Sequence, residues 1–339
     1  MPKIRELVMT SEIMKQAERV IAKTYKRFPV VLAKGNGCTL FDTRGRSYTD
    51  FVAGIAVCNL GHSHEGVANA VSAQAQTLTH VSNLYYTIPQ VELAAWLVEQ
   101  SFADRAFFCN SGAEANEAAI KLARKYFNDR GQNNRFRIIT MEQSFHGRTM
   151  ATLSATGQDK IKKGFDPVLE GFDYVPFNDI DAAGKSITQK TAAVIVEPVQ
   201  TENNCRTADK DYLVALRKFC DQTGALLIFD ESQTGFGRTG EKFASDYFGV
   251  LPDIMLLGEA LGGGMFPFSA MVFTGSVKTF FDKHPLIHLL TFGGHDVGCL
   301  VAAAAIKEYE QIQPWQNTQK QGKVLKERLK ELAGSHPKL

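Results

Sequence analysis

Short, wholly apolar runs alternate with helix-length segments from about residue 90 onward. Such runs are typical of parallel strands that are buried on both faces and joined by crossover helices. Each candidate strand is bounded by polar or glycine-containing turns, and the candidates are residues 105–109, 137–141, 192–196, 225–230 and 254–257. The sequence therefore predicts an α/β fold with a mainly parallel central sheet flanked by helices.

A different pattern precedes this region. Residues 31–40 and 41–51 predict a short β meander, with turns at Gly35 to Gly37 and at Gly45. We expect this meander to belong to a separate, smaller lobe. No internal repeat, low-complexity tract or long linker sets it apart, so both lobes are expected in one compact unit.

The composition is that of an ordinary globular protein: 339 residues, 44% of them apolar, with a formal net charge of +2. This charge gives no reason to expect a nucleic-acid or membrane partner. Residues 1–20 mix charged and apolar side chains, unlike a secretory signal, and no apolar run approaches the roughly 18 residues of a spanning helix. The six cysteines show no paired spacing. We therefore expect a cytoplasmic protein that acts on a small metabolite.

The residues from Asn110 to Glu114 form the clearest candidate anion site, because they follow an apolar strand and open a predicted helix. Backbone N–H groups at Ser111, Gly112 and Ala113 would meet a phosphate at the positive end of that helix. The same residues also fit a capping box without a ligand, in which Ser111 caps the helix and Glu114 lies three residues later.

Asp230 follows the apolar run 225–229, so it is expected at the carboxyl edge of a central strand. Open α/β sheets bind their ligands at this edge. A carboxylate there can keep a heterocyclic nitrogen protonated. Aspartate is also well suited to cap a helix or fix a loop, and the run alone does not decide between these roles.

The loop after another candidate strand holds Phe145, His146 and Arg148. Their aromatic ring, imidazole and guanidinium could stack on a flat cofactor and bind a carboxylate. Taken singly, they also fit a core phenylalanine and a surface arginine. His62 and His64 have a spacing that suits a metal, but no cysteine or carboxylate cluster accompanies them, so no metal site is predicted.

Together and in this order, these segments resemble class III aminotransferases of the acetylornithine, ornithine and putrescine group along essentially the whole chain. The matching stretches are FCNSGAEANEAAIKLA (108–123), FHGRT (145–149), VEPVQ (196–200), FDESQTGFGRTG (229–240) and TFGG (291–294). The resemblance implies a fold type I architecture with a smaller, partial domain, and a homodimer with shared active sites. It also implies an N-terminal segment with the small-lobe meander (1–60), a large cofactor-binding domain (61–310) and the start of a C-terminal small domain (311–339).

By the same resemblance, the cofactor is pyridoxal phosphate. Its phosphate would bind at Ser111, Gly112 and Ala113, and Thr291 would reach the phosphate in the partner subunit. The residues at its ring would be the stacking Phe145, the neighbouring His146, Asp230 on the ring nitrogen and Gln233 on the ring hydroxyl oxygen. A protonated ring nitrogen draws electrons from the reacting amino carbon, and a buried aspartate keeps it protonated.

The resemblance also implies a substrate pocket. Arg148 would hold a substrate carboxylate. Glu197 and Glu202 resemble the acidic residues that control which carboxylate or amine enters. The substrates would be an ω-amine or amino acid and a 2-oxo acid such as 2-oxoglutarate.

The sequence departs from the family at Glu259, which stands where the family has the lysine that binds the cofactor covalently and transfers the proton. A carboxylate cannot form that covalent bond, although it can still transfer a proton. Glutamate also suits the solvated first turn of a helix. Residues 201–204 and His295 depart from the family pattern as well, and residue 339 precedes the family's carboxylate-binding arginine.

Three functions stay open at this point. We expect a class III aminotransferase-like protein that binds pyridoxal phosphate noncovalently and whose amino group transfer is impaired by the loss of the lysine. The alternative is a catalytically inactive pseudoenzyme that acts as a dimer partner or ligand-binding protein. A third function is a lysine-independent reaction in which Glu259 is the general base.

Overall fold

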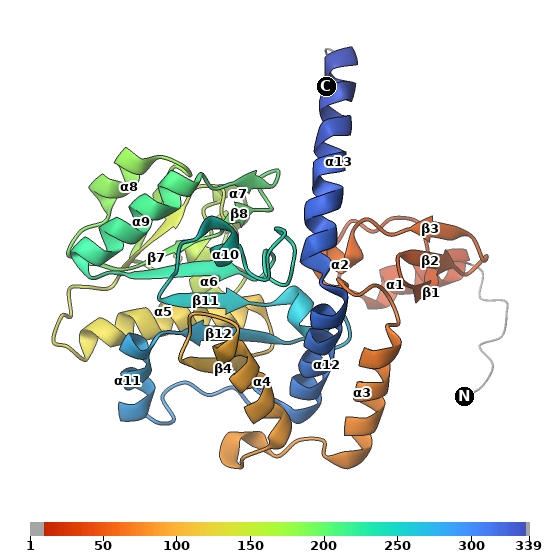
Figure 1. The fold of residues 1–339 in the computed structure, drawn as a ribbon, viewed down its shortest axis with the longest axis horizontal. Coiled ribbons are helices and arrows are strands. Elements are labelled where there is room, and N and C mark those ends of the chain that lie inside the picture. Colours follow the sequence, from red (N-terminus) through yellow and green to blue (C-terminus); the bar gives the residue numbers. More distant parts are fainter. Residues whose placement is uncertain (1–9, 337–339) are drawn as a thin grey trace.

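The central element of the computed structural model, which describes residues 10–336, is a seven-stranded sheet. Its strand order is β4 (Arg105–Cys109), β12 (Ser269–Phe273), β11 (Ile254–Leu257), β10 (Leu226–Glu231), β7 (Thr191–Val196), β5 (Arg137–Met141) and β6 (Phe172–Val175). The strands from β11 to β6 run parallel, whereas β12 is antiparallel to both of its neighbours. The predicted mainly parallel α/β fold is therefore confirmed (Figure 1).

All five predicted strands are present, with ends that differ by at most one residue. The sequence pattern does not predict β6 or β12. The β6 sequence, FDYV, lies at the edge of the sheet and mixes polar with apolar residues. The β12 strand returns antiparallel directly after a glycine- and proline-containing turn, which breaks the alternation of strand and helix on which the prediction depends.

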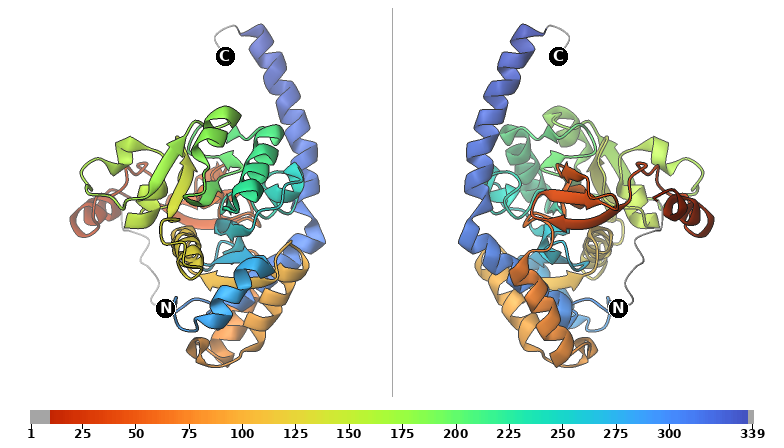
Figure 2. Two further views of the ribbon diagram at one scale, coloured as in Figure 1. Left: turned by 90° about the vertical axis from the view of Figure 1, so that its left-hand side faces the viewer. Right: turned by 90° about the vertical axis from the view of Figure 1, so that its right-hand side faces the viewer.

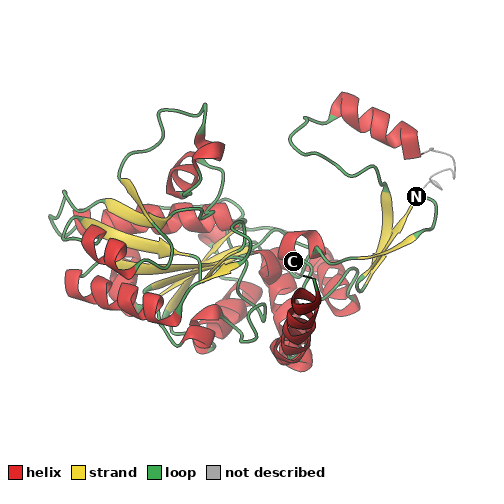
Figure 3. Ribbon diagram, turned by 90° about the horizontal axis from the view of Figure 1, so that it is seen from above, coloured by secondary structure: helices red, strands yellow, loops and turns green. Residues whose placement is uncertain are grey.

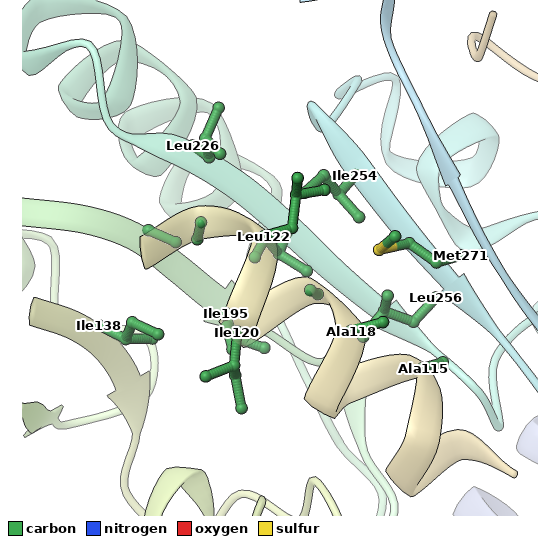
Figure 4. Packing of buried hydrophobic residues seen from close by; sticks show 14 of the residues in the cluster. Ala115, Ala118, Ile120, Leu122, Ile138, Ile195, Leu226, Ile254, Leu256 and Met271 are labelled. Atoms are coloured by element: carbon green, nitrogen blue, oxygen red, sulfur yellow. The ribbon is translucent and has the colours of Figure 1, made fainter. Parts of the chain in front are cut away.

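Helices cover both faces of the sheet, as a view from above shows (Figure 3). On one face lies α5 (Gly112–Asn128), whose Ala118 and Leu122 pack against Ile195 and Ile254 (Figure 4). On the other face, α9 (Lys210–Thr223) and α8 (Ile180–Ser186) cover the alternate strand residues. Because successive side chains of a strand point to opposite faces, wholly apolar strands are what two helical layers require.

A third group of helices packs beside β4 and β12. It consists of α3 (Glu65–Thr77), α4 (Ile88–Glu99) and α12 (Asp296–Ile312), which share one apolar cluster that includes Leu93, Leu97 and Val301. The shorter elements are α2 (Ala53–Ala56), η1 (Ser82–Leu84), α6 (Met150–Ala155), α7 (Asp159–Lys162), α10 (Ala244–Phe248), η2 (Glu259–Gly262), α11 (Gly275–Lys283) and the hairpin β8 (Val199–Gln200) with β9 (Arg206–Thr207).

The predicted meander is present as an antiparallel sheet of β1 (Leu32–Asn36), β2 (Thr39–Asp42) and β3 (Ser47–Thr49). Together with α1 (Thr10–Val20) it lies beside the main body, on the α3 side (Figure 1). The long α13 (Pro314–Ser335) projects from the body and has no buried residue (Figure 2). Part of the predicted N-terminal segment, residues 1–9, lies outside the described residues. Within residues 10–336, no helix combines the length and apolarity needed to cross a membrane.

Candidate active site

The start of α5 lies just after β4, where the sequence predicts an anion site. Ser111 is the N-cap, and its Oγ accepts a hydrogen bond from the backbone N–H of Glu114 at 3.2 Å. The Glu114 carboxylate accepts the backbone N–H of Asn110 at 2.8 Å. The predicted capping box is therefore present only in part, because Glu114 accepts the N–H of Asn110 and not that of the N-cap Ser111. It leaves the N–H groups of Gly112 and Ala113 without a capping partner in the described part of the chain, so these two donors can serve an anion.

Most of the predicted site residues lie at one edge of the sheet. The strands β4, β5, β7, β10 and β11 run in the same direction, so their carboxyl ends share this edge. The residues that follow these ends include Ser111, Phe145, Glu197, Ser232 and Glu259. Parallel strands thus bring together side chains that lie far apart in the sequence.

Asp230, near the end of β10, is the centre of a buried polar cluster and is 5% exposed. Its Oδ2 accepts hydrogen bonds from Asn116 Nδ2 at 2.8 Å and from His146 Nδ1 at 2.9 Å. Its Oδ1 accepts hydrogen bonds from the backbone N–H of Ser232 at 3.2 Å and from Ser232 Oγ at 2.7 Å. The roughly four acceptor positions of a carboxylate are therefore all filled.

These hydrogen bonds keep Asp230 charged. Burial alone raises the pKa of its carboxyl, but the hydrogen bonds from His146, Ser232 and Asn116 outweigh burial and lower that pKa below its ordinary value. The backbone of His146 is itself fixed, because its N–H donates to Thr156 Oγ1 at 2.9 Å. The site therefore contains a buried, fixed negative charge.

Phe145 and Glu197 meet in the loops after β5 and β7. The backbone N–H of Phe145 donates to Glu197 Oε2 at 2.9 Å, so Glu197 holds the backbone that carries the predicted stacking ring. Burial, together with the charges of Asp230 and Glu202, raises the pKa of Glu197 well above its ordinary value. Arg148 is exposed, and its guanidinium carbon lies 5.3 Å from the centre of the Phe145 ring.

Glu259 opens η2 directly after β11 and lines a pocket of about 460 Å³. The start of α5 forms another wall of this pocket, and the other lining residues are Val57, Asn110, Ser111, Gly112, Gly264, Met265, Phe266, Pro267 and Phe268. Burial and the negative charge of Asp230 raise the pKa of Glu259 to about 7. One interpretation of the sequence places Glu259 in the solvated first turn of a helix. It does lie at a helix start, but it is half-buried and its backbone φ is +32°. Non-glycine residues rarely adopt this left-handed conformation, which is more frequent at functional sites.

Three predicted residues make no hydrogen bond to Asp230, Phe145 or Glu197 among the described residues, although the charge of Glu202 acts on Glu197. Thr291 and Glu202 are exposed, and Gln233 is half-buried in the loop after β10. The sequence patterns do not single out Asn116 and Ser232, which both donate to Asp230. Asn116 could have been found as a polar residue on the alanine-rich buried face of α5, one turn after Gly112.

The two histidines with metal-like spacing have other partners. His62 Nε2 lies 2.7 Å from Asp50 Oδ2, and His64 Nε2 lies 3.9 Å from Glu308 Oε2. Among residues 10–336, no group of three or more histidine, cysteine or acidic side chains is arranged to hold a metal ion.

Comparison with known sequences decides the family. The sequence profile of the family described as Aminotransferase class-III matches residues 20–339. The chain belongs to the class III aminotransferases. The acetylornithine aminotransferase of Nostoc sp. is 48% identical over 324 residues, which cover 94% of this chain and 75% of that protein. The acetylornithine aminotransferase of Methanocaldococcus jannaschii is 51% identical over 288 residues, which cover 85% of this chain and 72% of that protein.

Solved structures agree with this class III aminotransferase in fold. The ornithine aminotransferase of Toxoplasma gondii has a TM-score of 0.93 at 30% identity, over 98% of this chain and 79% of that one. The acetylornithine aminotransferase of Elizabethkingia anophelis has a TM-score of 0.85 at 30% identity, over 96% and 79% of the two chains. Another Toxoplasma gondii ornithine aminotransferase structure holds pyridoxal phosphate at partial occupancy in its active site. The predicted fold type I architecture and the family's pyridoxal phosphate cofactor are thus confirmed.

The residues of this chain fit that cofactor, except at Glu259. Asp230 offers a buried negative charge to a ring nitrogen, and the start of α5 offers free N–H groups to a phosphate. A Cβ atom at Gly112 would lie 2.9 Å from Ser232 Oγ, so only glycine permits this close approach. His146 Nε2 and Asn116 Oδ1 are buried without a partner among the described residues, and a bound ligand would supply partners for such atoms.

Proposed function

We propose that this chain binds pyridoxal phosphate, or its amine form, without a covalent bond. We also propose that its transfer of an amino group from an acetylornithine-, ornithine- or putrescine-type amine to a 2-oxo acid is impaired. The observation that carries both proposals is Glu259 in the wall of a pocket that also contains Gly112, close enough to Asp230 for the charge of Asp230 to raise its pKa. A carboxylate cannot bond to the cofactor aldehyde as a lysine does.

Different residues would bind the phosphate and the ring of the cofactor. The cofactor supplies an electron-withdrawing ring when bound. Gly112 and Ala113, with Ser111, would bind the phosphate through the start of α5. Asp230, positioned by His146, would hold a proton on the ring nitrogen, because a buried negative charge stabilises a buried cation. Phe145 would stack on the ring and Gln233 would contact its hydroxyl oxygen.

Glu259 would be the group that moves a proton at the amino carbon of the substrate. Its pKa of about 7 means that it can accept and return a proton at neutral pH. Arg148 would bind the substrate carboxylate, and its exposed position beside the Phe145 ring supports this role. Glu197 and Glu202 would select the amine.

The test of noncovalent binding is an absorbance spectrum after incubation with pyridoxal phosphate and gel filtration. We expect the wild-type chain to retain the absorbance of the free aldehyde. Glu259→Lys should gain a new band that borohydride abolishes while it fixes the cofactor covalently to the protein, and Met265→Lys, which places a lysine in the same pocket, should not. If none of the three proteins retains the cofactor, the binding proposal is wrong.

We further propose that the protein is a cytoplasmic homodimer with the three-part division 1–60, 61–310 and 311–339. Leu84, Tyr86 and Ile88 are 78%, 99% and 72% exposed, next to a mostly apolar groove of about 760 Å³ between α4 and β4. A second copy would cover this surface. The exposed Thr291 could then reach the phosphate site of the partner. Sedimentation should give a dimer that Tyr86→Asp weakens, and a monomeric wild-type chain at micromolar concentration would contradict the proposal.

The second candidate function is an inactive partner in a mixed dimer. Two observations favour it: Glu259 lines the pocket at the position where the resemblance places a lysine, and Thr291 is exposed. Mixing the chain with an active acetylornithine aminotransferase should give co-assembly in native mass spectrometry. Separate homodimers after prolonged mixing would exclude this function.

A further inference from the structure

The donors around Asp230 differ in how easily they can leave. Asn116 Nδ2 is anchored by a second hydrogen bond to the carbonyl oxygen of Gly112 at 3.1 Å, and His146 is 2% exposed with its backbone bound to Thr156. The backbone N–H of Ser232 is part of the chain. Ser232 Oγ, at 2.7 Å from Asp230 Oδ1, is therefore the donor that rotation about one side-chain bond can withdraw.

The Ser232 hydroxyl lies close to the wall of this pocket. A Cβ atom at Gly112 would lie 2.9 Å from Ser232 Oγ, and one at Gly258 would lie 3.6 Å from it. Gly112 lines the pocket, and Gly258 directly precedes Glu259, which lines it as well. The hydroxyl thus stands beside two pocket walls and in contact with the carboxylate behind them.

We infer that Ser232 is a positioning residue that competes with the ligand for Asp230. Its hydroxyl occupies the acceptor position on Asp230 Oδ1 that a cationic ring nitrogen needs, so binding of a phosphorylated pyridine requires the hydroxyl to rotate away. This inference rests on the proposed function of the site. It explains how Asp230 stays ionised before the ligand binds, and it implies that the serine weakens cofactor binding by the cost of breaking its hydrogen bond.

The test is the affinity of Ser232→Ala for two ligands, measured by fluorescence titration. Pyridoxal phosphate should bind about fivefold to tenfold more tightly than to the wild-type chain, which is the factor for one net hydrogen bond. The deaza analogue, in which a C–H group replaces the ring nitrogen, should bind both proteins equally. Thr234→Val is the matched control, because the Thr234 hydroxyl lies in the same loop but faces Glu231 Oε2 at 3.5 Å.

Each outcome bears on one of the two proposals. Tighter binding of pyridoxal phosphate alone supports the role of Ser232. Unchanged or weaker binding, or an equal gain for both ligands, overturns that role and leaves the cofactor proposal standing. If neither ligand binds either protein at millimolar concentration, the proposed function fails and this inference fails with it. Ser232→Gly removes the same hydroxyl and serves as the second variant if Ser232→Ala does not fold.

Discussion

His146 Nδ1 lies 2.9 Å from Asp230 Oδ2, and both side chains are buried. This contact joins the loop after β5 to the end of β10, two strands away in the sheet. It contributes to the hydrogen bonds that keep Asp230 charged despite its burial. The carboxyl edge of the sheet is therefore organised around a buried charge, and this charge also acts on the neighbouring carboxyls of Glu197 and Glu259.

Replacing Asp230 by asparagine should remove this charge with little change in shape. We expect the affinity of Asp230→Asn for pyridoxal phosphate to fall at least about tenfold, because hydrogen bonds to charged groups contribute roughly 1.5–3 kcal/mol. The control is Glu231→Gln. Glu231 is the next buried carboxyl, but it accepts the backbone N–H groups of Ala244 and Ser245. That variant should keep its affinity for pyridoxal phosphate, and an equal loss of affinity in both variants would argue against Asp230 as the ring-nitrogen partner.

Glu259 should make the stability of the protein depend on pH. Because folding raises its pKa from 4.5 to about 7, the folded state binds this proton more tightly. The contribution is complete below the unfolded pKa and is lost as the pH rises through about 7. Glu259→Gln should therefore raise the free energy of unfolding by about 3 kcal/mol at pH 8 and by about 1 kcal/mol at pH 5. The exposed Glu99→Gln should change neither value, and an equal effect of Glu259→Gln at both pH values would contradict the raised pKa.

The sequence predicts the interior of the fold better than its edges. The wholly buried strands β7 and β10 are visible because two helical layers demand apolar residues on both faces. The edge strand β6 mixes polar with apolar residues, and β12 breaks the alternation of strand and helix. Neither strand is therefore visible in the sequence pattern. The ends of the predicted strands are accurate to about one residue, because apolar residues can continue into the turns beyond a strand.

The site was predictable where a residue type itself carries chemistry. Asp230 at a strand end and glycine at a helix start are such residues, and the shared strand direction brings them together. The roles of Ser232 and Asn116 could not be predicted, because serine and asparagine are common in loops and caps. Their role depends on which atom they face, and only three-dimensional packing decides that.

Glu197 should hold the loop of Phe145 through one hydrogen bond. Glu197→Ala leaves the Phe145 N–H without its acceptor, so the free energy of unfolding should fall by about 1–3 kcal/mol. Glu197→Gln retains an oxygen at this position and removes the buried charge, so it should be more stable than Glu197→Ala. Urea unfolding compares the two variants at one pH. Equal losses in both would mean that the carboxyl charge, and not the acceptor oxygen, is what Phe145 requires.

A methyl group at Gly112 should test the start of α5 as a binding surface. In Gly112→Ala, the new Cβ atom would lie 2.9 Å from Ser232 Oγ and 3.3 Å from Ser232 Cβ, so Ser232 must move toward the pocket or toward Asp230. We expect overpacking to cost about 1–3 kcal/mol of stability and the affinity for pyridoxal phosphate to fall. The control is Gly322→Ala in α13, where a Cβ atom meets nothing within 4 Å and alanine favours the helix. It should leave the affinity unchanged. If Gly112→Ala bound the cofactor as tightly as the wild-type chain, the close packing of Gly112 against Ser232 would not be required for binding.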